Sequence, residues 1–378
     1  MTTDPFDLPL ERLRERRSAK WTRNPAGSLP LWVAEMDVRI AEPIAARLHR
    51  AIDDSDLGYA GEESRLVEAF AGFAQRRWGW DITGARTWVH SDLADSGSTV
   101  LRSLAGEGGG VIITTPVYNA FFHWLERAGV RKVEVPLLSP ETGGRLDLQR
   151  IAERFAAGDK VLLLSHPHNP TGVVHPREDL VALAELAAAH EAYVVADEIH
   201  APLTYPGVDF VPYLTVSDAA RRTGVALHSA SKSWNLAGLK SSLVIADPDG
   251  PKLPALSVES TWSSGILGML AAEVAFAEGE PWLDVVRAAL AERAAYLQDK
   301  LPTSIGYHPP SASYLAWLDL RDTGLPGEPA REILRRTDLF ISAGPLFGEL
   351  GAGWARLNFA TSYPILDDAI DRIIRAIG

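Results

Sequence analysis

The sequence predicts an α/β protein with a mostly parallel central sheet and a smaller C-terminal α/β domain. Short apolar runs at 111–114 and 160–165 end in proline or polar residues. Residues 178–190 then carry apolar side chains at helical spacing, and the apolar run 193–197 follows. Strand, helix and strand joined by short connections form a βαβ unit, whose parallel strands are buried on both faces.

The order of the remaining elements predicts how the chain is divided. Further strands of the sheet are expected at 225–227 and 243–246, and beyond about residue 262 the pattern changes to helices at 266–277 and 281–301, strands at 314–318 and 354–359, and a helix at 366–377. We therefore expect a large domain at 46–261 and a small domain at 262–378. Residues 1–45 are expected to form an arm that packs on the small domain.

Composition excludes several classes of protein. With 46% hydrophobic and 23% charged residues, the chain is typical of a globular protein. A net charge of −12 argues against a nucleic-acid partner. The absence of cysteine excludes disulfides, thiolate metal sites and a cysteine nucleophile, and no metal site is predicted. No signal peptide and no apolar run of about 20 residues is found, so we expect a cytoplasmic protein without a membrane segment.

Three polar residues follow strands of the predicted sheet. Asn169 comes after the run 160–165, Asp197 ends the run 193–197, and Lys232 follows 225–227. In such sheets ligands bind beyond the carboxyl ends of the strands, so the three side chains are expected in one pocket. They supply an amine for an aldehyde, a carboxylate for a ring nitrogen and an amide for a ring oxygen, which are the groups that pyridoxal phosphate needs. Lys232 would form an imine and later act as a general base.

Each of these residues also has a purely structural interpretation. Lys232 could be a solvated surface lysine, although its place among serines after an apolar strand disfavours exposure. Asp197 could cap the next turn, but an unpaired carboxylate would be expensive to bury at a strand end. Asn169 begins Asn-Pro-Thr-Gly, a typical turn sequence. The order of all three favours the cofactor site.

Three further side chains are candidates for the same pocket. Tyr118 follows a strand and could stack on the cofactor ring or belong to the core. His200 lies three residues beyond Asp197 and could approach the ring oxygen or be an ordinary loop histidine. Arg356 alternates with apolar residues of a strand, and its guanidinium suits a substrate carboxylate.

The phosphate site is the least distinct part of the pattern, because no glycine-rich loop follows a strand. Residues 89–99 precede a possible helix whose first backbone N–H groups, those of Leu93 and Ala94 among them, could bind an anion. Asp92 and Asp95 disfavour side-chain binding of phosphate there. Ser229 and Lys240 are the better side-chain candidates.

Several motifs resemble those of fold type I pyridoxal-phosphate enzymes of the aminotransferase class I/II superfamily. Within it the chain resembles the MalY/PatB group of cystathionine or cysteine-S-conjugate β-lyases, and the actinobacterial C–S lyases in particular. The motifs are Lys20-Trp-Thr-Arg, Leu29-Pro-Leu-Trp-Val-Ala-Glu-Met-Asp37, Gly58-Tyr59, Pro116-Val-Tyr118, His166-Pro-His-Asn-Pro170, Asp197-Glu-Ile-His-Ala-Pro-Leu203, the segment 229–240, Tyr314-Leu-Ala-Trp-Leu-Asp319 and Ala355-Arg-Leu-Asn-Phe-Ala360.

The resemblance implies a role for each matched position. Lys232 would carry the cofactor, Asp197 would bind the ring nitrogen, and Asn169 the ring oxygen. Stacking, phosphate and carboxylate contacts would come from Tyr118, from Ser229 and Lys240, and from Arg356, with Ala34 near the substrate. Tyr59 would reach the phosphate of the neighbouring subunit, which implies a homodimer with shared sites. The implied reaction is β-elimination of a cysteine S-conjugate to thiol, pyruvate and ammonia.

Other functions stay open at this point. An aminotransferase would differ only in where the substrate-derived carbanion is reprotonated. A specialised enzyme could act on a bulky S-conjugate with decarboxylation or oxidative deamination. A ligand-sensing domain of a transcription regulator is disfavoured, because the enzyme-like pattern begins by Lys20 and leaves no room for a helix-turn-helix module.

Overall fold

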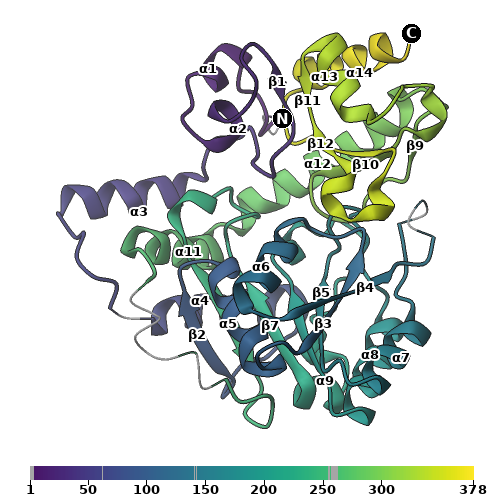
Figure 1. The fold of residues 1–378 in the computed structure, drawn as a ribbon. Coiled ribbons are helices and arrows are strands. Elements are labelled where there is room, and N and C mark those ends of the chain that lie inside the picture. Colours follow the sequence, from purple (N-terminus) through teal and green to yellow (C-terminus); the bar gives the residue numbers. More distant parts are fainter. Residues whose placement is uncertain (1–3, 62, 140, 142, 254–255, 257–262) are drawn as a thin grey trace.

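The computed structural model describes residues 4–61, 63–139, 141, 143–253, 256 and 263–378. Its centre is a seven-stranded sheet with strand order β2-β8-β7-β6-β5-β3-β4 (Figure 1). Strands β4, β3, β5, β6 and β7 are parallel to one another, whereas β8 is antiparallel to both β7 and β2. The predicted mostly parallel sheet is confirmed. Its strands are β2 (Arg86–His90), β3 (Gly110–Thr115), β4 (Arg131–Pro136), β5 (Val161–Ser165), β6 (Tyr193–Asp197), β7 (Gly224–His228) and β8 (Ser242–Ala246).

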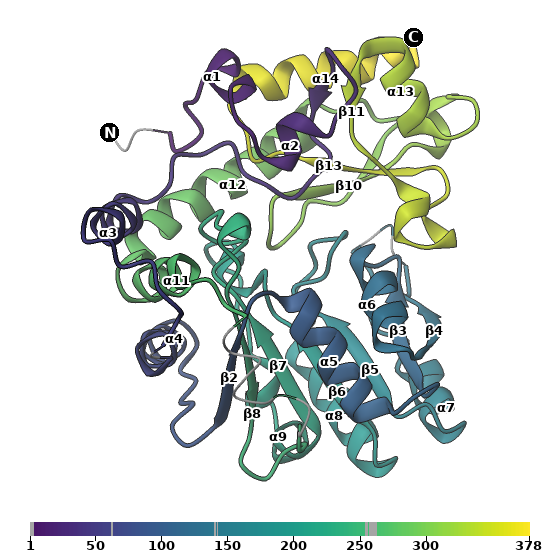
Figure 2. The same ribbon diagram turned by 60° about the vertical axis from the view of Figure 1, so that its left-hand side comes forward.

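Both faces of this sheet are buried, because successive side chains of a strand point to opposite faces. In β3, Val111 and Ile113 belong to one apolar cluster and Ile112 to the other. The first cluster includes side chains of α5 (Leu93–Ala105) and α6 (Ala120–Ala128), which lie in front of the sheet in Figure 2. The second includes side chains of α4 (Ser64–Trp78), α7 (Leu148–Ala156), α8 (Arg177–Ala189) and α11 (Ile266–Glu278). Uninterrupted apolar strands therefore predicted a two-sided sheet correctly.

The C-terminal part forms a smaller α/β unit above the carboxyl ends of the parallel strands (Figures 1 and 2). Its antiparallel sheet has the order β12-β13-β10-β9. The elements are α12 (Glu280–Lys300), β9 (Gly306–Tyr307), β10 (Leu315–Asp319), α13 (Pro329–Thr337), β11 (Leu339–Phe340), β12 (Ser342–Ala343), β13 (Trp354–Asn358) and α14 (Tyr363–Ile377). The strands and helices expected after residue 265 are all present within a few residues of their predicted bounds.

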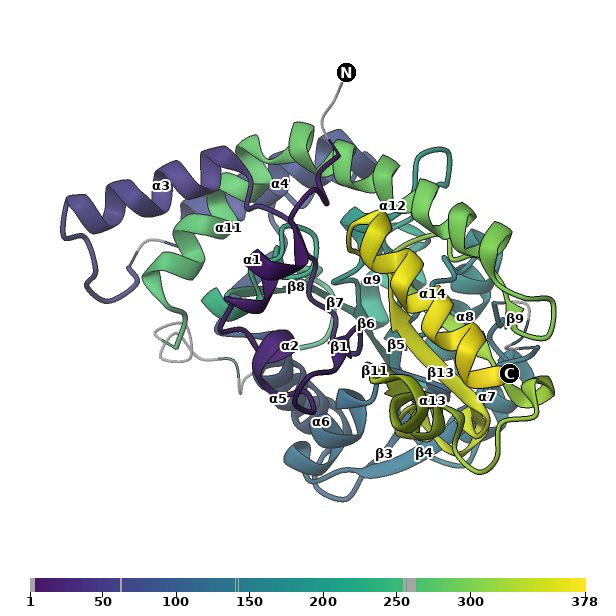
Figure 3. The same cartoon turned by 90° about the horizontal axis from the view of Figure 1, so that it is seen from above.

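The N-terminal segment joins this smaller unit. Two short helices, α1 (Leu10–Arg14) and α2 (Ala19–Thr22), precede β1 (Leu29–Pro30), which pairs in parallel with β11. Helix α3 (Glu42–Asp53) then projects to one side of the molecule (Figure 3). We keep the division at residues 45 and 261 as a proposal: the first boundary falls within α3, and the second lies outside the described residues. In the described part of the chain, no helix is long and apolar enough to span a membrane.

Candidate active site

A cavity of about 170 Å³ lies at the carboxyl ends of the parallel strands. Nine of the predicted site residues line it: Leu93, Ala94, Tyr118, Asn169, Asp197, His200, Ser229, Lys232 and Lys240. They lie at the end of β6 or in the segments after β2, β3, β5, β6 and β7, so strands of one sheet bring them together.

Lys232 lies in the loop after β7, and its Nζ donates a hydrogen bond to the carbonyl oxygen of Ala34 at 3.1 Å. Burial, and next the positive charge of Arg356, lower the pKa of this amine to about 8, against the charges of Glu35 and Asp197, which raise it. A lysine with such a pKa is partly neutral near physiological pH, which a nucleophilic or basic amine requires.

Asp197 is the last residue of β6 and is buried. One carboxylate oxygen, Oδ1, accepts a hydrogen bond from the N–H of Ile199 at 3.2 Å. Burial raises the pKa of the carboxyl group to about 7, against the Ile199 N–H and the charge of Lys232, which lower it. A protonated ring nitrogen in the pocket would give this carboxylate the charged partner that its burial demands.

Arg356 of β13 fixes the orientation of Asn169. Its Nη1 donates to Asn169 Oδ1 at 3.0 Å, and a guanidinium has no acceptor atom, so the amide oxygen must face the arginine. The amide NH₂ of Asn169 is therefore the end left for a ligand oxygen. The guanidinium lies 4.8 Å from the ring centroid of Phe347, and its Nη2 donates to the Trp32 carbonyl at 3.0 Å. Burial lowers the pKa of Arg356 to about 10, which leaves it charged at neutral pH.

Tyr118 and His200 both line the cavity as neutral groups. Burial raises the pKa of the Tyr118 phenol, so it keeps its proton. Burial, followed by the charges of Lys232 and Arg356, lowers the pKa of His200 to about 3. The Nδ1 atom of His200 is buried with no hydrogen-bond partner among the described residues, which leaves it available to a bound ligand.

The phosphate end contains an ion pair that the sequence did not predict. Lys240 Nζ lies 2.8 Å from Asp92 Oδ2, while Asp92 Oδ1 caps α5 by accepting from the N–H of Asp95. Burial is the largest influence and raises the pKa of Asp92, but the bonds from Lys240 and Asp95 together hold it below its ordinary value. Asp95 itself pairs with Arg127. Of the two acidic residues, only Asp92 therefore lines the pocket, and there it already neutralises a cation.

Trp124 of α6 also lines the cavity and was not anticipated. Its ring lies against Gly97 in α5, where an added Cβ would come within 2.6 Å of the indole. Gly97 thus lets the two helices approach closely enough for Trp124 to wall the pocket. A glycine inside a helical pattern was the one signal available, and it does not identify its partner.

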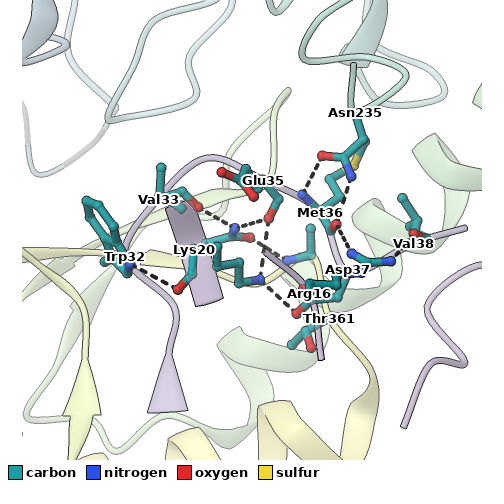
Figure 4. A network of polar contacts seen from close by, with 12 residues as sticks. Arg16, Lys20, Trp32, Val33, Glu35, Met36, Asp37, Val38, Asn235 and Thr361 are labelled. Atoms are coloured by element: carbon teal, nitrogen blue, oxygen red, sulfur yellow. Dashed lines mark hydrogen bonds and ion pairs between the residues drawn. The ribbon is translucent and has the colours of Figure 1, made fainter. Parts of the chain in front are cut away.

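A second unanticipated feature is the segment 32–38, which has few backbone partners of its own and is held by side chains (Figure 4). Lys20 Nζ pairs with the Asp37 carboxylate at 2.7 Å, and both side chains are buried. Asn235 in the Lys232 loop bonds both the N–H and the carbonyl of Met36, at 2.8 and 3.0 Å. Asn358 Nδ2 donates to two more carbonyls of the segment. We call residues 32–38 the strap.

Three predicted residues, Arg356, Ala34 and Tyr59, are not among those that line the cavity. Arg356 contacts the lining residue Asn169 through the hydrogen bond described above. Ala34 belongs to the strap, and its carbonyl oxygen accepts the hydrogen bond from Lys232. Tyr59 is 91% exposed. Because its predicted role is in the site of a neighbouring subunit, that role stays a prediction.

The assembled groups fit pyridoxal phosphate. An amine, a buried carboxyl that forms no salt bridge with a described residue, an oriented amide and a lysine beside the start of a helix surround one cavity, matching the aldehyde, ring nitrogen, ring oxygen and phosphate of that cofactor. No group of three or more potential ligands for a metal ion occurs in the part of the chain that the structure describes.

Comparisons with known proteins agree with this geometry. Residues 62–373 match the family described as aminotransferase class I and II. The chain is 39% identical over its full length to a Mycobacterium tuberculosis protein provisionally named cystathionine β-lyase, 99% of which is covered. It is 31% identical to cystathionine β-lyase PatB of Bacillus subtilis, covering 99% of this chain and 100% of that one.

Solved structures show the same fold. A crystal structure from Corynebacterium diphtheriae, whose name provisionally assigns it as a PLP-dependent β-cystathionase, is 33% identical with a TM-score of 0.90, covering 98% of each chain. A C–S lyase from Staphylococcus hominis has a TM-score of 0.89 at 22% identity, with 98% of each chain covered, which supports the fold alone. This chain therefore belongs to the aminotransferase class I and II family.

Proposed function

We propose that this protein is a pyridoxal-phosphate-dependent carbon–sulfur β-lyase that converts a cysteine S-conjugate of the cystathionine type, with water, to thiol, pyruvate and ammonia. The observation that carries the proposal is the convergence of Lys232, Asp197 and Asn169 on one cavity, with the guanidinium of Arg356 hydrogen-bonded to Asn169. The full-length similarity to proteins named cystathionine β-lyase supplies the reaction class.

Pyridoxal phosphate, when bound, supplies an aldehyde that takes up amines and a ring that stabilises negative charge on the substrate α-carbon. Asp197 would bind the ring nitrogen and keep it protonated. The amide of Asn169 and the imidazole of His200 would bind the ring oxygen, and Tyr118 would stack on the ring. Ser229, Lys240 and the N–H groups of Leu93 and Ala94 would hold the phosphate.

The chain's own residues then bind the substrate and move its proton. Arg356 would hold the substrate carboxylate, with its Nε atom, which has no partner among the described residues, as one donor. Ala34 would lie beside the bound substrate. The free amine of Lys232 would remove the proton from the α-carbon, after which the Cβ–S bond breaks and its electron pair leaves with the sulfur.

A reduction experiment tests the assignment of Lys232. Purified protein mixed with pyridoxal phosphate and reduced with borohydride should carry the cofactor on the peptide that contains Lys232. The Lys232→Ala variant should lose this adduct and the activity. A reduced adduct on another lysine of the wild-type protein would overturn the assignment.

The reaction type is tested by turnover without a 2-oxo acid. With cystathionine or another cysteine S-conjugate, we expect thiol, pyruvate and ammonia in equal amounts over many turnovers. An aminotransferase would stop after one equivalent and resume when 2-oxoglutarate is added, which would refute the lyase proposal. Release of carbon dioxide with an aldehyde would instead indicate a decarboxylating enzyme.

A homodimer with shared sites is part of the proposal. Ile52, Leu57 and Tyr59 are 54%, 52% and 91% exposed on and after the projecting helix α3, and exposed apolar groups of this kind are typical of an interface. Tyr59 would reach the phosphate in the partner's site. Mixed dimers of inactive Lys232→Ala and impaired Tyr59→Phe protomers should regain activity, because one intact site is rebuilt. No gain in heterodimers shown to form would contradict the role of Tyr59. The cytoplasmic location remains a prediction.

A further inference from the structure

The carbonyl oxygen of Ala34 accepts two hydrogen bonds, one from each of two different parts of the chain. One comes from Lys232 Nζ at 3.1 Å and the other from the hydroxyl of Tyr314 at 3.0 Å. Tyr314 is fully buried immediately before β10, with its ring 6.1 Å from that of His200. We propose that Tyr314 is a positioning residue: through the Ala34 carbonyl, it holds the free ε-amine of Lys232 in the position from which the amine acts. The importance of this position for turnover rests on the proposed lyase function.

The Ala34 carbonyl is a fixed acceptor because the strap is tied on both sides of it. Asn358 Nδ2 donates to the carbonyls of Val33 and Glu35, at 2.7 and 2.6 Å. A backbone carbonyl between two such anchors has little freedom to turn. The amine of Lys232 therefore meets an oxygen whose direction is set by the small unit, not by its own loop.

The Lys232 loop is tied to the strap at a second point. Asn235 follows Lys232 by three residues and adopts a φ of +58°, a conformation that asparagine tolerates better than most residues. Its amide bonds both the N–H and the carbonyl of Met36 (Figure 4). Two contacts, Lys232 with Ala34 and Asn235 with Met36, thus set the register of the loop against the strap.

The hydroxyl of Tyr314 also affects the protonation of the amine. A carbonyl oxygen has two lone pairs and stabilises an ammonium more strongly than a neutral amine. Because Tyr314 occupies one lone pair, the oxygen is a weaker acceptor for the ammonium of Lys232. Without the Tyr314 hydroxyl, the Ala34 carbonyl oxygen should accept a hydrogen bond from Lys232 alone. The stronger bond should favour the charged form of the amine.

The other charged groups around the amine are the same with or without this hydroxyl. Arg356 and Lys240 oppose a positive charge on Lys232, whereas Glu35 and Asp197 favour it. The nearby His200 is neutral at the pH values of interest. A change caused by Tyr314→Phe can therefore be attributed to the hydrogen bond on Ala34.

The test measures the amine in the apoprotein, without any reaction. Wild type and Tyr314→Phe are labelled with acetic anhydride from neutral to alkaline pH, and acetylation of the Lys232 peptide is quantified by mass spectrometry. The wild-type profile should have its midpoint near pH 8, since burial lowers the pKa to about 8. In Tyr314→Phe the midpoint should rise, with labelling at neutral pH reduced about two- to tenfold, the range of one net hydrogen bond.

Tyr205→Phe is the matched control. Tyr205 is also buried and donates its hydroxyl to a backbone carbonyl, that of Ser313 at 2.9 Å, but it does not touch Ala34 or Lys232. Its labelling profile should equal that of wild type. In the holoenzyme, Tyr314→Phe should lower kcat by a similar factor with KM nearly unchanged, because the hydroxyl does not bind the substrate carboxylate.

An unchanged or lowered midpoint in folded Tyr314→Phe would overturn the proposal, as would an equal shift in Tyr205→Phe. If circular dichroism shows that Tyr314→Phe does not fold, Asn358→Ser replaces it. This variant loses the bonds to the Val33 and Glu35 carbonyls, so the Ala34 carbonyl between them becomes free to turn and should hold the amine of Lys232 less firmly. A wild-type protein without lyase activity would refute the proposed function, yet the labelling profiles would still decide the role of Tyr314.

Discussion

Replacing Lys20 by methionine should destabilise the protein far more than the loss of a surface charge would. Lys20 and Asp37 form an ion pair at 2.7 Å whose side chains are 0% and 1% exposed. The substitution keeps most of the side-chain volume but leaves the Asp37 carboxylate buried, and its Oδ1 has no hydrogen-bond partner among the described residues. Breaking such a pair on one side costs about 3–5 kcal/mol.

The double variant Lys20→Met/Asp37→Leu separates charge from packing. Replacement of a buried ion pair by apolar groups of similar volume is often close to neutral, so the double variant should recover most of the loss. Arg12→Met is the matched control in the same arm, because its pair with Glu15 is 70% and 65% exposed and should be worth less than about 1 kcal/mol.

Urea unfolding of the apoproteins, followed by tryptophan fluorescence and circular dichroism, measures these differences. Trypsin cleavage in the arm would show whether residues 10–38 detach before the rest unfolds. The reasoning fails if Lys20→Met is no less stable than Arg12→Met, or if the double variant is as unstable as the single one.

Three further perturbations address the pocket. Arg356→Lys should raise KM for the amino-acid substrate about ten- to a hundredfold in steady-state assays, because a lysine cannot form the two-pronged contact with a carboxylate; an unchanged KM would argue against the clamp. Asp92→Asn keeps an oxygen to cap α5 but frees Lys240 from its 2.8 Å ion pair, so titration of the apoprotein with pyridoxal phosphate should show several-fold tighter binding. Weaker binding would contradict the inference that Asp92 competes with the phosphate for Lys240. Asp197→Asn should stabilise the apoprotein above pH 7 by about 4 kcal/mol and have no effect near pH 3. Burial raises the pKa of the folded carboxyl to about 7, so the wild-type protein loses stability as pH rises from about 4 to 7. Equal urea midpoints for this variant and wild type at all pH values would refute that account.

The parts predicted well from sequence are those determined locally. The central strands are continuous apolar runs, and the polar residue after each run lies in the site because parallel strands place their carboxyl ends at one edge. Lys232, Asp197 and Asn169 follow from this rule alone. Strands β2 and β4 were missed because Arg86, Arg131 and Lys132 interrupt their apolar pattern at exposed or half-buried positions.

The strap could not be predicted, because its conformation depends on contacts between distant parts of the chain. Met36 is bonded by Asn235, 199 residues away, and Glu35 by Asn358, 323 residues away. The apolar pattern of residues 32–38 does not indicate these partners. Asparagine is also common in turns, so Asn235 and Asn358 would be read from sequence as turn residues. The motif Trp32 to Asp37 indicated a family, whereas its physical role is visible only in three dimensions.

The electrostatics of the cavity explain why the same residues favour ligand binding. Burial moves Lys232, Asp197 and Arg356 toward their neutral forms, lowering the pKa of the two bases and raising that of the acid. Each of these groups would meet a complementary group in the proposed complex: an aldehyde for Lys232, a ring N–H for Asp197 and a carboxylate for Arg356. The apoprotein therefore retains a desolvation cost that cofactor and substrate would relieve. In a site of this kind, the buried groups lower the stability of the apoprotein and raise its affinity for cofactor and substrate. A substitution such as Asp197→Asn should therefore stabilise the fold while abolishing the enzymatic activity.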